Sequence, residues 1–171
     1  TKAGRMHRVV PIANETHSVK DPKRVKGMYL SIVQFFRESL EKRIALLDAQ
    51  REHLPVLVDA LKEKVSESFA RNTSFINKHK NEIYIVSNGF KDFIEPIVTE
   101  YGILASNIFA NDFEYDEEGA IVSFNKDNIL SRNNGKPAQI EALQLEGEVF
   151  VLGDGVTDSE IKEAGFANKF Y

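Results

Sequence analysis

The stretch Val149-Phe150-Val151-Leu152-Gly153-Asp154-Gly155-Val156-Thr157-Asp158 decides the fold of this chain. It is typical of an apolar strand that ends on an aspartate between two glycines, with a second aspartate four residues later. Open α/β sheets bind their ligands at the carboxyl ends of the strands, and glycine lets the backbone approach an anion or a metal ion closely. Asp154 is therefore a candidate Mg²⁺ ligand, because a hard carboxylate oxygen suits that ion. The alternative is a glycine-rich turn with a capping aspartate.

Two further motifs lie upstream, Ser87-Asn88-Gly89-Phe90 after a predicted strand and Gly135-Lys136 at the start of a predicted helix. The Ser87 hydroxyl and the amides after it suit a phosphoryl oxygen at a helix N-terminus, and a simple N-cap serine is the alternative. A lysine at a helix start is unfavourable for the helix dipole, so Lys136 indicates an anionic substrate unless it is a surface lysine. Asp158 either caps its own helix or pairs with Lys136.

Strands and helices alternate after residue 80. We predict strands over 82–86, 108–111, 149–152 and from 170, helices over 90–101, 136–145 and 159–164, and a hairpin over 113–124. This alternation predicts an α/β fold with a parallel sheet and helices on its faces.

The first eighty residues divide differently. Residues 1–28 are basic and weakly patterned; a short strand over 7–13 is compatible with them, but Pro11 argues against a central one. Apolar residues then recur at spacings of three and four from Leu30 to Leu47, which predicts a first amphipathic helix. Pro55 suits the start of a second helix, and a third apolar helical face follows it. We predict an unmatched N-terminal segment (1–28), a small helical cap (29–79) and an α/β core (80–171) that is incomplete at its C-terminal end.

In this order the motifs resemble the last three motifs of the haloacid dehalogenase (HAD)-type phosphatases, and among them the phosphoserine phosphatases. That family has Ser-Gly-Gly-Phe as its second motif, Gly-Lys as its third and Gly-Asp-Gly-x-x-Asp as its last. The stretch Phe36-Arg37-Glu38-Ser39-Leu40-Glu41-Lys42-Arg43 is similar to its cap signature, Phe-x-x-Ser-Leu-x-x-Arg. The resemblance covers roughly residues 36–171 and implies a Rossmann-like HAD core with a small helical cap.

The resemblance also implies a function and roles for the site residues. It implies Mg²⁺-dependent hydrolysis of a small phosphomonoester, most closely phosphoserine in serine biosynthesis, through an aspartyl-phosphate. The implied roles are catalysis by Lys136 and Asp158, substrate binding by Phe36, Arg43, Ser87, Asn88 and Gly89, and metal binding by Asp154. Arg43 would bind the substrate carboxylate and Phe36 would shield the site. The alternative for this segment is an amphipathic helix with Phe36 and Leu40 in the core and Arg43 on the surface.

The chain departs from the family at its first motif, Asp-x-Asp-x-Thr, whose first aspartate is the nucleophile. No Asp-x-Asp occurs before residue 112, and the nearest placement by strand pattern, Pro11-Ile12-Ala13-Asn14-Glu15, puts proline and alanine where both aspartates belong. The nucleophile is unknown, so we expect an impaired hydrolase with weak or absent Mg²⁺ binding. The alternative is a non-catalytic phosphate-binding or interaction module, or a truncated product. Asn88 in place of glycine is a milder change, because asparagine tolerates positive φ.

Composition excludes other classes of function. The 171 residues include no cysteine, which excludes disulfides and thiolate chemistry. We see no apolar run of membrane-spanning length and no signal peptide, so we expect a cytoplasmic protein with no membrane partner. Residues 1–80 carry a net charge of +7 and residues 81–171 one of −11. The positive residues alternate with acids at helical spacing after Arg37, so we expect no nucleic acid partner. The oligomeric state stays open.

Overall fold

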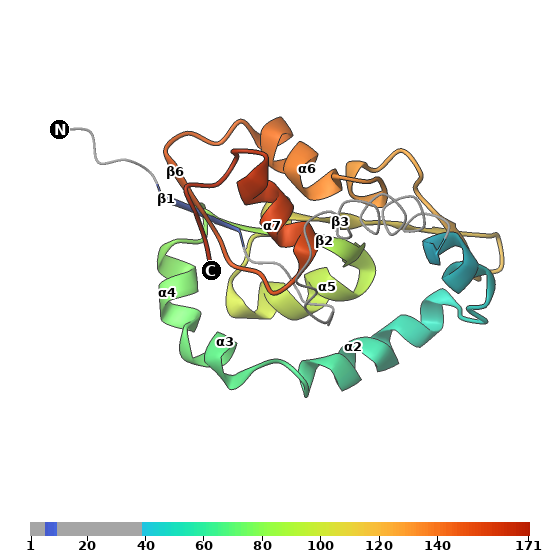
Figure 1. Cartoon of the computed structure of the whole chain (residues 1–171). Helices are drawn as coiled ribbons and strands as arrows, with labels where there is room; N and C mark the ends of the chain where they lie inside the picture. Colours follow the sequence, from blue (N-terminus) through green and yellow to red (C-terminus); the bar gives the residue numbers. More distant parts are fainter. Residues whose placement is uncertain (1–5, 10–38) are drawn as a thin grey trace.

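The computed structural model describes residues 6–9 and 39–171 (Figure 1). Its strands are β1 (Met6–Val9), β2 (Ile83–Phe90), β3 (Ile108–Asn111), β4 (Phe113–Tyr115), β5 (Ile121–Phe124), β6 (Glu148–Val151) and β7 (Lys169–Phe170). Its α-helices are α2 (Leu54–Lys62), α3 (Glu67–Arg71), α4 (Thr73–Lys78), α5 (Lys91–Val98), α6 (Gly135–Leu143) and α7 (Val156–Glu163). The 3₁₀ turns are η1 (Arg51–His53), η2 (Thr99–Tyr101), η3 (Ala105–Asn107) and η4 (Ile129–Ser131). Residues 39–45 are also helical.

Five strands form a parallel sheet in the order β3-β2-β1-β6-β7. This confirms the predicted α/β class. The prediction that Pro11 keeps the first strand out of the centre of the sheet is wrong, because β1 pairs with β2 on one side and with β6 on the other. The described strand is Met6–Val9, and Pro11 lies outside the described part of the chain.

Both faces of the sheet are covered, as a parallel sheet requires. Side chains alternate between the faces along β2. Ile83 and Ile85 pack in one cluster with residues of α4 and α5, whereas Val86 packs in another with residues of α6 and α7. Figure 1 shows α6 and α7 on one side of the strands and α5 on the other. The apolar runs of the sequence therefore form two core layers around one sheet.

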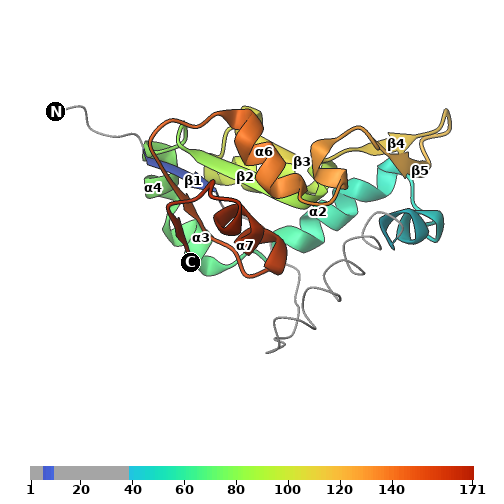
Figure 2. The same cartoon turned by 45° about the horizontal axis from the view of Figure 1, so that its top comes forward.

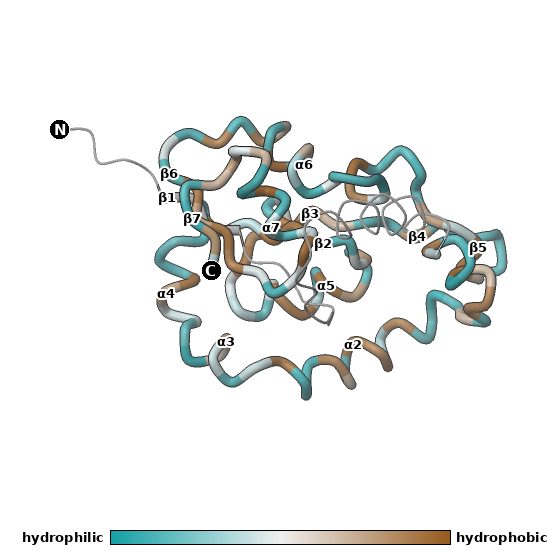
Figure 3. Tube along the Cα trace, viewed as in Figure 1, coloured by the Kyte–Doolittle hydropathy of each residue, from teal (hydrophilic) through white to brown (hydrophobic). Residues whose placement is uncertain are grey.

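The helices before residue 80 follow the predicted pattern in part. Pro55 lies in the first turn of α2, as predicted. Figure 3 shows hydrophobic residues along α2, of which Val58 is buried and Val56 is 73% exposed. The third apolar face forms two short helices, and Ile76 of α4 packs in the cluster of β2 and α5. The cap boundary at residue 79 stays a prediction, and residues 29–38 of the predicted cap lie outside the described part.

The predicted hairpin is present as the antiparallel pair β4–β5, with Gly119 at positive φ in its turn. Figure 2 shows it projecting past the sheet, beside residues 39–45 and the start of α2. The Ile121 amide donates to the Ala49 carbonyl at 2.9 Å, and the Arg51 amide donates to the Gly119 carbonyl at 2.8 Å. The hairpin and the segment after residue 48 are therefore joined through backbone hydrogen bonds.

Side chains fasten the same hairpin to α5. The Tyr115 hydroxyl donates to Asp92 Oδ1 at 2.6 Å, and the Arg51 guanidinium lies 4.1 Å from the centre of the tyrosine ring. Burial and the hydrogen bond to Asp92 raise the pKa of Tyr115 above its usual value. The segment after residue 48, the hairpin and the start of α5 thus form one connected unit.

No helix within residues 6–9 and 39–171 is both long enough and apolar enough to cross a membrane.

Candidate functional site

The second and last motifs lie at the same edge of the sheet. The second motif (87–90) forms the end of β2, and the last motif (153–158) begins two residues after β6. Because β1 lies between these parallel strands, its carboxyl end at Val9 points to the same edge. The sequence after Val9 reads Val10-Pro11-Ile12-Ala13-Asn14 and contains no carboxylate. These five residues lie outside the described part.

The second motif interrupts the regular pairing of β2 with β3. Val86 pairs with Phe109 and Phe90 with Asn111, so four steps along β2 match two along β3. Such bulges re-aim side chains and are frequent beside active sites. The strand continues to Phe90, which is the N-cap of α5. The alternative reading of Ser87 as the N-cap is therefore wrong.

The side chain of Ser87 is buried, and its Oγ accepts a hydrogen bond from the Gly89 amide at 3.0 Å. Neither Asn88 nor Gly89 has a positive φ. Our explanation for asparagine at position 88 is therefore wrong: the backbone is extended there and does not need a residue that tolerates positive φ. Asn88 instead uses its side chain, donating from Nδ2 to the Leu130 carbonyl at 2.8 Å.

Lys136 is buried with 5% of its surface exposed, so the reading as a surface lysine is wrong. Its ammonium group forms a hydrogen-bonded ion pair with Asp158 Oδ1. Gly135 precedes it at the start of α6, where a Cβ atom would lie 2.5 Å from the Ile129 carbonyl oxygen. Only glycine lets the helix start approach that backbone so closely.

Both alternatives for Asp158 hold. Oδ1 binds Lys136, and Oδ2 accepts from the Gly155 amide at 3.1 Å at the start of α7. A Cβ atom on Gly153 would lie 2.5 Å from the Cβ atom of Asp158, so the first glycine of the motif makes room for this aspartate. Asp158 is thus the aspartate that caps α7, whereas Asp154 is exposed in the turn between the two glycines.

A cavity of about 400 Å³ lies between residues 39–57, the hairpin and the end of β2. Arg43, Asn88 and Gly89 line it together, although 45 residues separate the first two in the sequence. Its other lining residues are Ser39, Leu40, Ile44, Leu47, Ala49, Gln50, His53, Leu54, Leu57, Phe90, Phe93, Phe113 and Ile121. Most of these are apolar, and the Phe90 and Phe113 rings stack with centres 3.7 Å apart. Arg43 and Leu40 share one helical segment, with Leu40 buried and Arg43 exposed toward the cavity.

Sequence reasoning missed the contribution of the hairpin and of η1 to this cavity. Phe113 and Ile121 belong to the hairpin, and His53 accepts a hydrogen bond from the Gln50 amide at Nδ1. The alternation in 113–124 predicted a hairpin correctly, but no signal in it says which element the hairpin packs against. Phe36, the predicted shield of the site, lies outside the described residues.

The described residues do not by themselves fit Mg²⁺. Within residues 6–9 and 39–171 there is no group of three or more His, Cys, Asp or Glu side chains that could hold a metal ion. Asp154 supplies one exposed carboxylate at the sheet edge, whereas Mg²⁺ requires near-octahedral oxygen coordination and dehydrates reluctantly. A tight site would need ligands from outside this part of the chain.

We therefore expect this chain to bind Mg²⁺ with an affinity no better than roughly millimolar, because one carboxylate supplies too little charge. Calorimetric titration of Mg²⁺ measures it, with Asp154→Ala as the control. Micromolar binding that this substitution abolishes would contradict the expectation and would make Glu15 and Asp21 the next ligands to test.

Comparison with known proteins shows the family to which this chain belongs. The fold is that of the HAD superfamily, which confirms the resemblance found in the sequence. The model of the pyrimidine 5'-nucleotidase (UMPH-1) family matches residues 7–169, so the chain belongs to that family.

Curated relatives are phosphoserine phosphatases. The chloroplastic phosphoserine phosphatase of Arabidopsis thaliana is 26% identical over 138 residues, which cover 79% of this chain and 47% of the relative. Phosphoserine phosphatase of Homo sapiens is 24% identical over 128 residues, covering 73% of this chain and 57% of the relative. The chain thus spans about half the length of the curated relatives it matches.

Among solved structures, a phosphoserine phosphohydrolase-like protein from Francisella tularensis has the same fold, with a TM-score of 0.72 at 22% identity. The match covers 96% of this chain and 85% of that protein.

Proposed function

We propose that this chain binds a small phosphomonoester at the carboxyl edge of its sheet, as an impaired phosphatase of the HAD superfamily, with phosphoserine as the first substrate to test. The phosphoryl group lies at Ser87, Gly89 and Lys136, and the organic part lies in the cavity under the cap. The observation that carries the proposal is that Arg43, Asn88 and Gly89 line one cavity. A guanidinium group there suits a substrate carboxylate, which it can bind through two parallel hydrogen bonds.

The chemistry of the phosphate side rests on Ser87 and Lys136. Amide donors and an ammonium group stabilise the charge on a transferring phosphoryl group. The ion pair with Asp158 fixes the side chain of Lys136, so its position does not have to be organised at the moment of binding. Hydrolysis through an aspartyl-phosphate needs a carboxylate nucleophile, and the sequence that follows β1 offers none up to Glu15. A non-catalytic phosphate-binding module would therefore make every contact of the proposal and would differ only in not hydrolysing its ligand.

A second candidate ligand is a pyrimidine nucleoside 5'-monophosphate. The matched family is named for nucleotidases of that class, and the cavity has mostly apolar walls that include the stacked pair Phe90 and Phe113. At about 400 Å³ the cavity lies in the range that holds drug-sized ligands. Parallel titrations with phosphoserine and uridine 5'-monophosphate separate the two candidates by affinity.

Arg43→Ala tests the proposed carboxylate contact. We expect about a tenfold loss of phosphoserine affinity, because an exposed charge-assisted hydrogen bond is worth roughly 1.5 kcal/mol, and less than a twofold change for inorganic phosphate. Calorimetric titration measures both ligands. Lys42→Ala is the matched control, since it removes a neighbouring cation that does not line the cavity. Equal losses for both ligands in the Arg43 variant would rule out carboxylate recognition by this residue.

A further inference from the structure

Asn88 joins two parts of the proposed site that are far apart in the sequence. It lies in the β2 bulge between Ser87 and Gly89. Its Nδ2 donates to the Leu130 carbonyl at 2.8 Å, across 42 residues, and its own carbonyl accepts from Asn111 Nδ2 at 2.8 Å. Glycine, which the phosphoserine phosphatase motif has at this position, offers no side chain for the bond to Leu130. A chain with glycine at this position therefore cannot make this bond.

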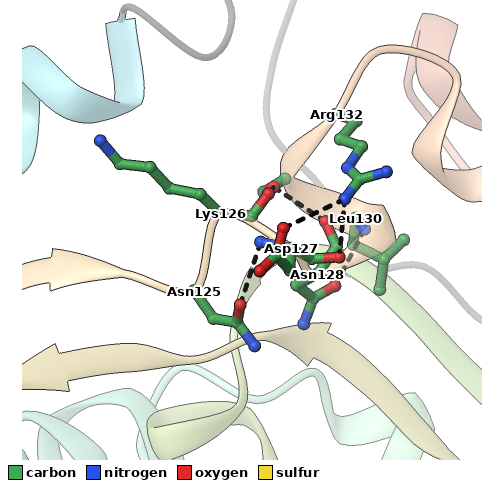
Figure 4. Close-up of polar contacts among 7 residues, drawn as sticks. Asn125, Lys126, Asp127, Asn128, Leu130 and Arg132 are labelled. Atoms are coloured by element: carbon green, nitrogen blue, oxygen red, sulfur yellow. Dashed lines mark hydrogen bonds and ion pairs between the residues drawn. The ribbon is translucent and has the colours of Figure 1, made fainter.

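The loop that Asn88 binds is internally fixed, as Figure 4 shows. Asn128 Oδ1 accepts from the Leu130 amide at 2.9 Å, and the Ser131 hydroxyl donates to the Asn128 carbonyl at 2.8 Å. Leu130 and Ser131 are almost completely buried. The Leu130 carbonyl that Asn88 binds therefore belongs to a buried loop tied by its own hydrogen bonds, so its position is coupled to that of the residues around it.

The same loop carries the start of α6. A Cβ atom on Gly135 would lie 2.5 Å from the Ile129 carbonyl oxygen and 2.9 Å from Leu130 Cα, so the backbone before Lys136 rests directly on Ile129 and Leu130. Lys136 is thus held at two points, by Asp158 at its ammonium group and by this loop at its backbone.

We propose that Asn88 is a positioning residue that sets the distance between Ser87 and Lys136 through the Leu130 carbonyl. The proposal rests on the proposed function, in which both of these groups bind the phosphoryl group. In this role Asn88 acts through the loop around Leu130 and through α6. The role is separate from its place in the wall of the cavity.

The test compares the ligand-free chain and its phosphate complex in Asn88→Ala and Asn88→Asp. Ionised aspartate keeps the shape of asparagine but cannot donate to a carbonyl. We expect both variants to shift the NMR signals of the Lys136 side chain and to speed amide exchange at Leu130 and Gly135 in the absence of ligand. We expect inorganic phosphate to bind about fivefold more weakly, as for the loss of one hydrogen bond.

The matched control is Asn107→Ala. Asn107 Nδ2 donates to the Ile83 and Lys80 carbonyls, so it also links β2 to its surroundings, but at the opposite end of the strand. We expect this variant to lose stability without moving the Lys136 signals or the phosphate affinity.

Unchanged Lys136 signals in both Asn88 variants would overturn the positioning role, whether or not phosphate affinity falls. Shifts of equal size in the Asn107 variant would also overturn it. If the unaltered chain binds no phosphate, the proposed function fails, while the signals of Lys136 in the ligand-free protein still decide the role of Asn88.

Discussion

Asp158→Ala is expected to lower the free energy of unfolding by about 3–5 kcal/mol, because it leaves the ammonium group of Lys136 buried without its partner. Asp158 has 2% and Lys136 5% of its surface exposed, so water cannot replace the lost carboxylate without opening the core. The substitution also removes the acceptor of the Gly155 amide at the start of α7, which adds the loss of a helix cap. Urea denaturation followed by circular dichroism measures the change.

Two controls show whether burial is the cause. Glu100→Ala removes the partner of Lys62, with which it forms a 2.6 Å ion pair whose side chains are 53% and 32% exposed. We expect that variant to lose no more than about 1 kcal/mol. The double variant Lys136→Met/Asp158→Leu should recover much of the stability lost in Asp158→Ala, since no charge remains buried. A loss below about 1 kcal/mol in Asp158→Ala would contradict the assignment of a buried, mutually dependent pair.

The sequence predicted the fold class well because the alternation of strands and helices depends on local pattern. The β-branched run before Ser87 and the glycines around Asp154 each indicate where a strand ends, without reference to distant parts of the chain. The short first strand could not be placed in the same way. The position of β1 at the centre of the sheet depends on its pairing with β2 and β6, which lie more than seventy residues away in the sequence.

The sequence named candidate site residues one by one, but of the contacts that connect them it offered only the pairing of Asp158 with Lys136. For Asp158 the sequence left a choice between capping and pairing, and the two carboxylate oxygens serve one role each. For Asn88 we considered only backbone conformation, whereas the structure uses the side chain as a link to Leu130. Contacts of this kind join segments that are far apart in the sequence, and the periodicity of a single sequence does not reveal them.

Turnover is the property for which the expected effect is largest. This chain should hydrolyse phosphoserine and a generic aryl phosphate in Mg²⁺ at least about 10⁴-fold more slowly than a typical enzyme, whose turnover number is about 10 s⁻¹. The physical reason is that Ser87 and Lys136 can stabilise charge but cannot replace the carboxylate that attacks phosphorus and carries the covalent intermediate. Release of phosphate over hours, measured with purified chain against a buffer blank, gives the rate.

The matched gain-of-function variant is Pro11→Asp/Ala13→Asp, which restores both aspartates at their predicted places after β1. If that placement is right, this variant should turn over phosphoserine measurably faster than the unaltered chain, and adding Asp154→Asn should abolish the gain. Robust turnover by the unaltered chain would contradict the prediction in one of two ways. Turnover that survives Asp154→Asn would locate the reaction away from this edge of the sheet, whereas turnover that requires Asp154 would mean that another carboxylate takes the place of the missing nucleophile.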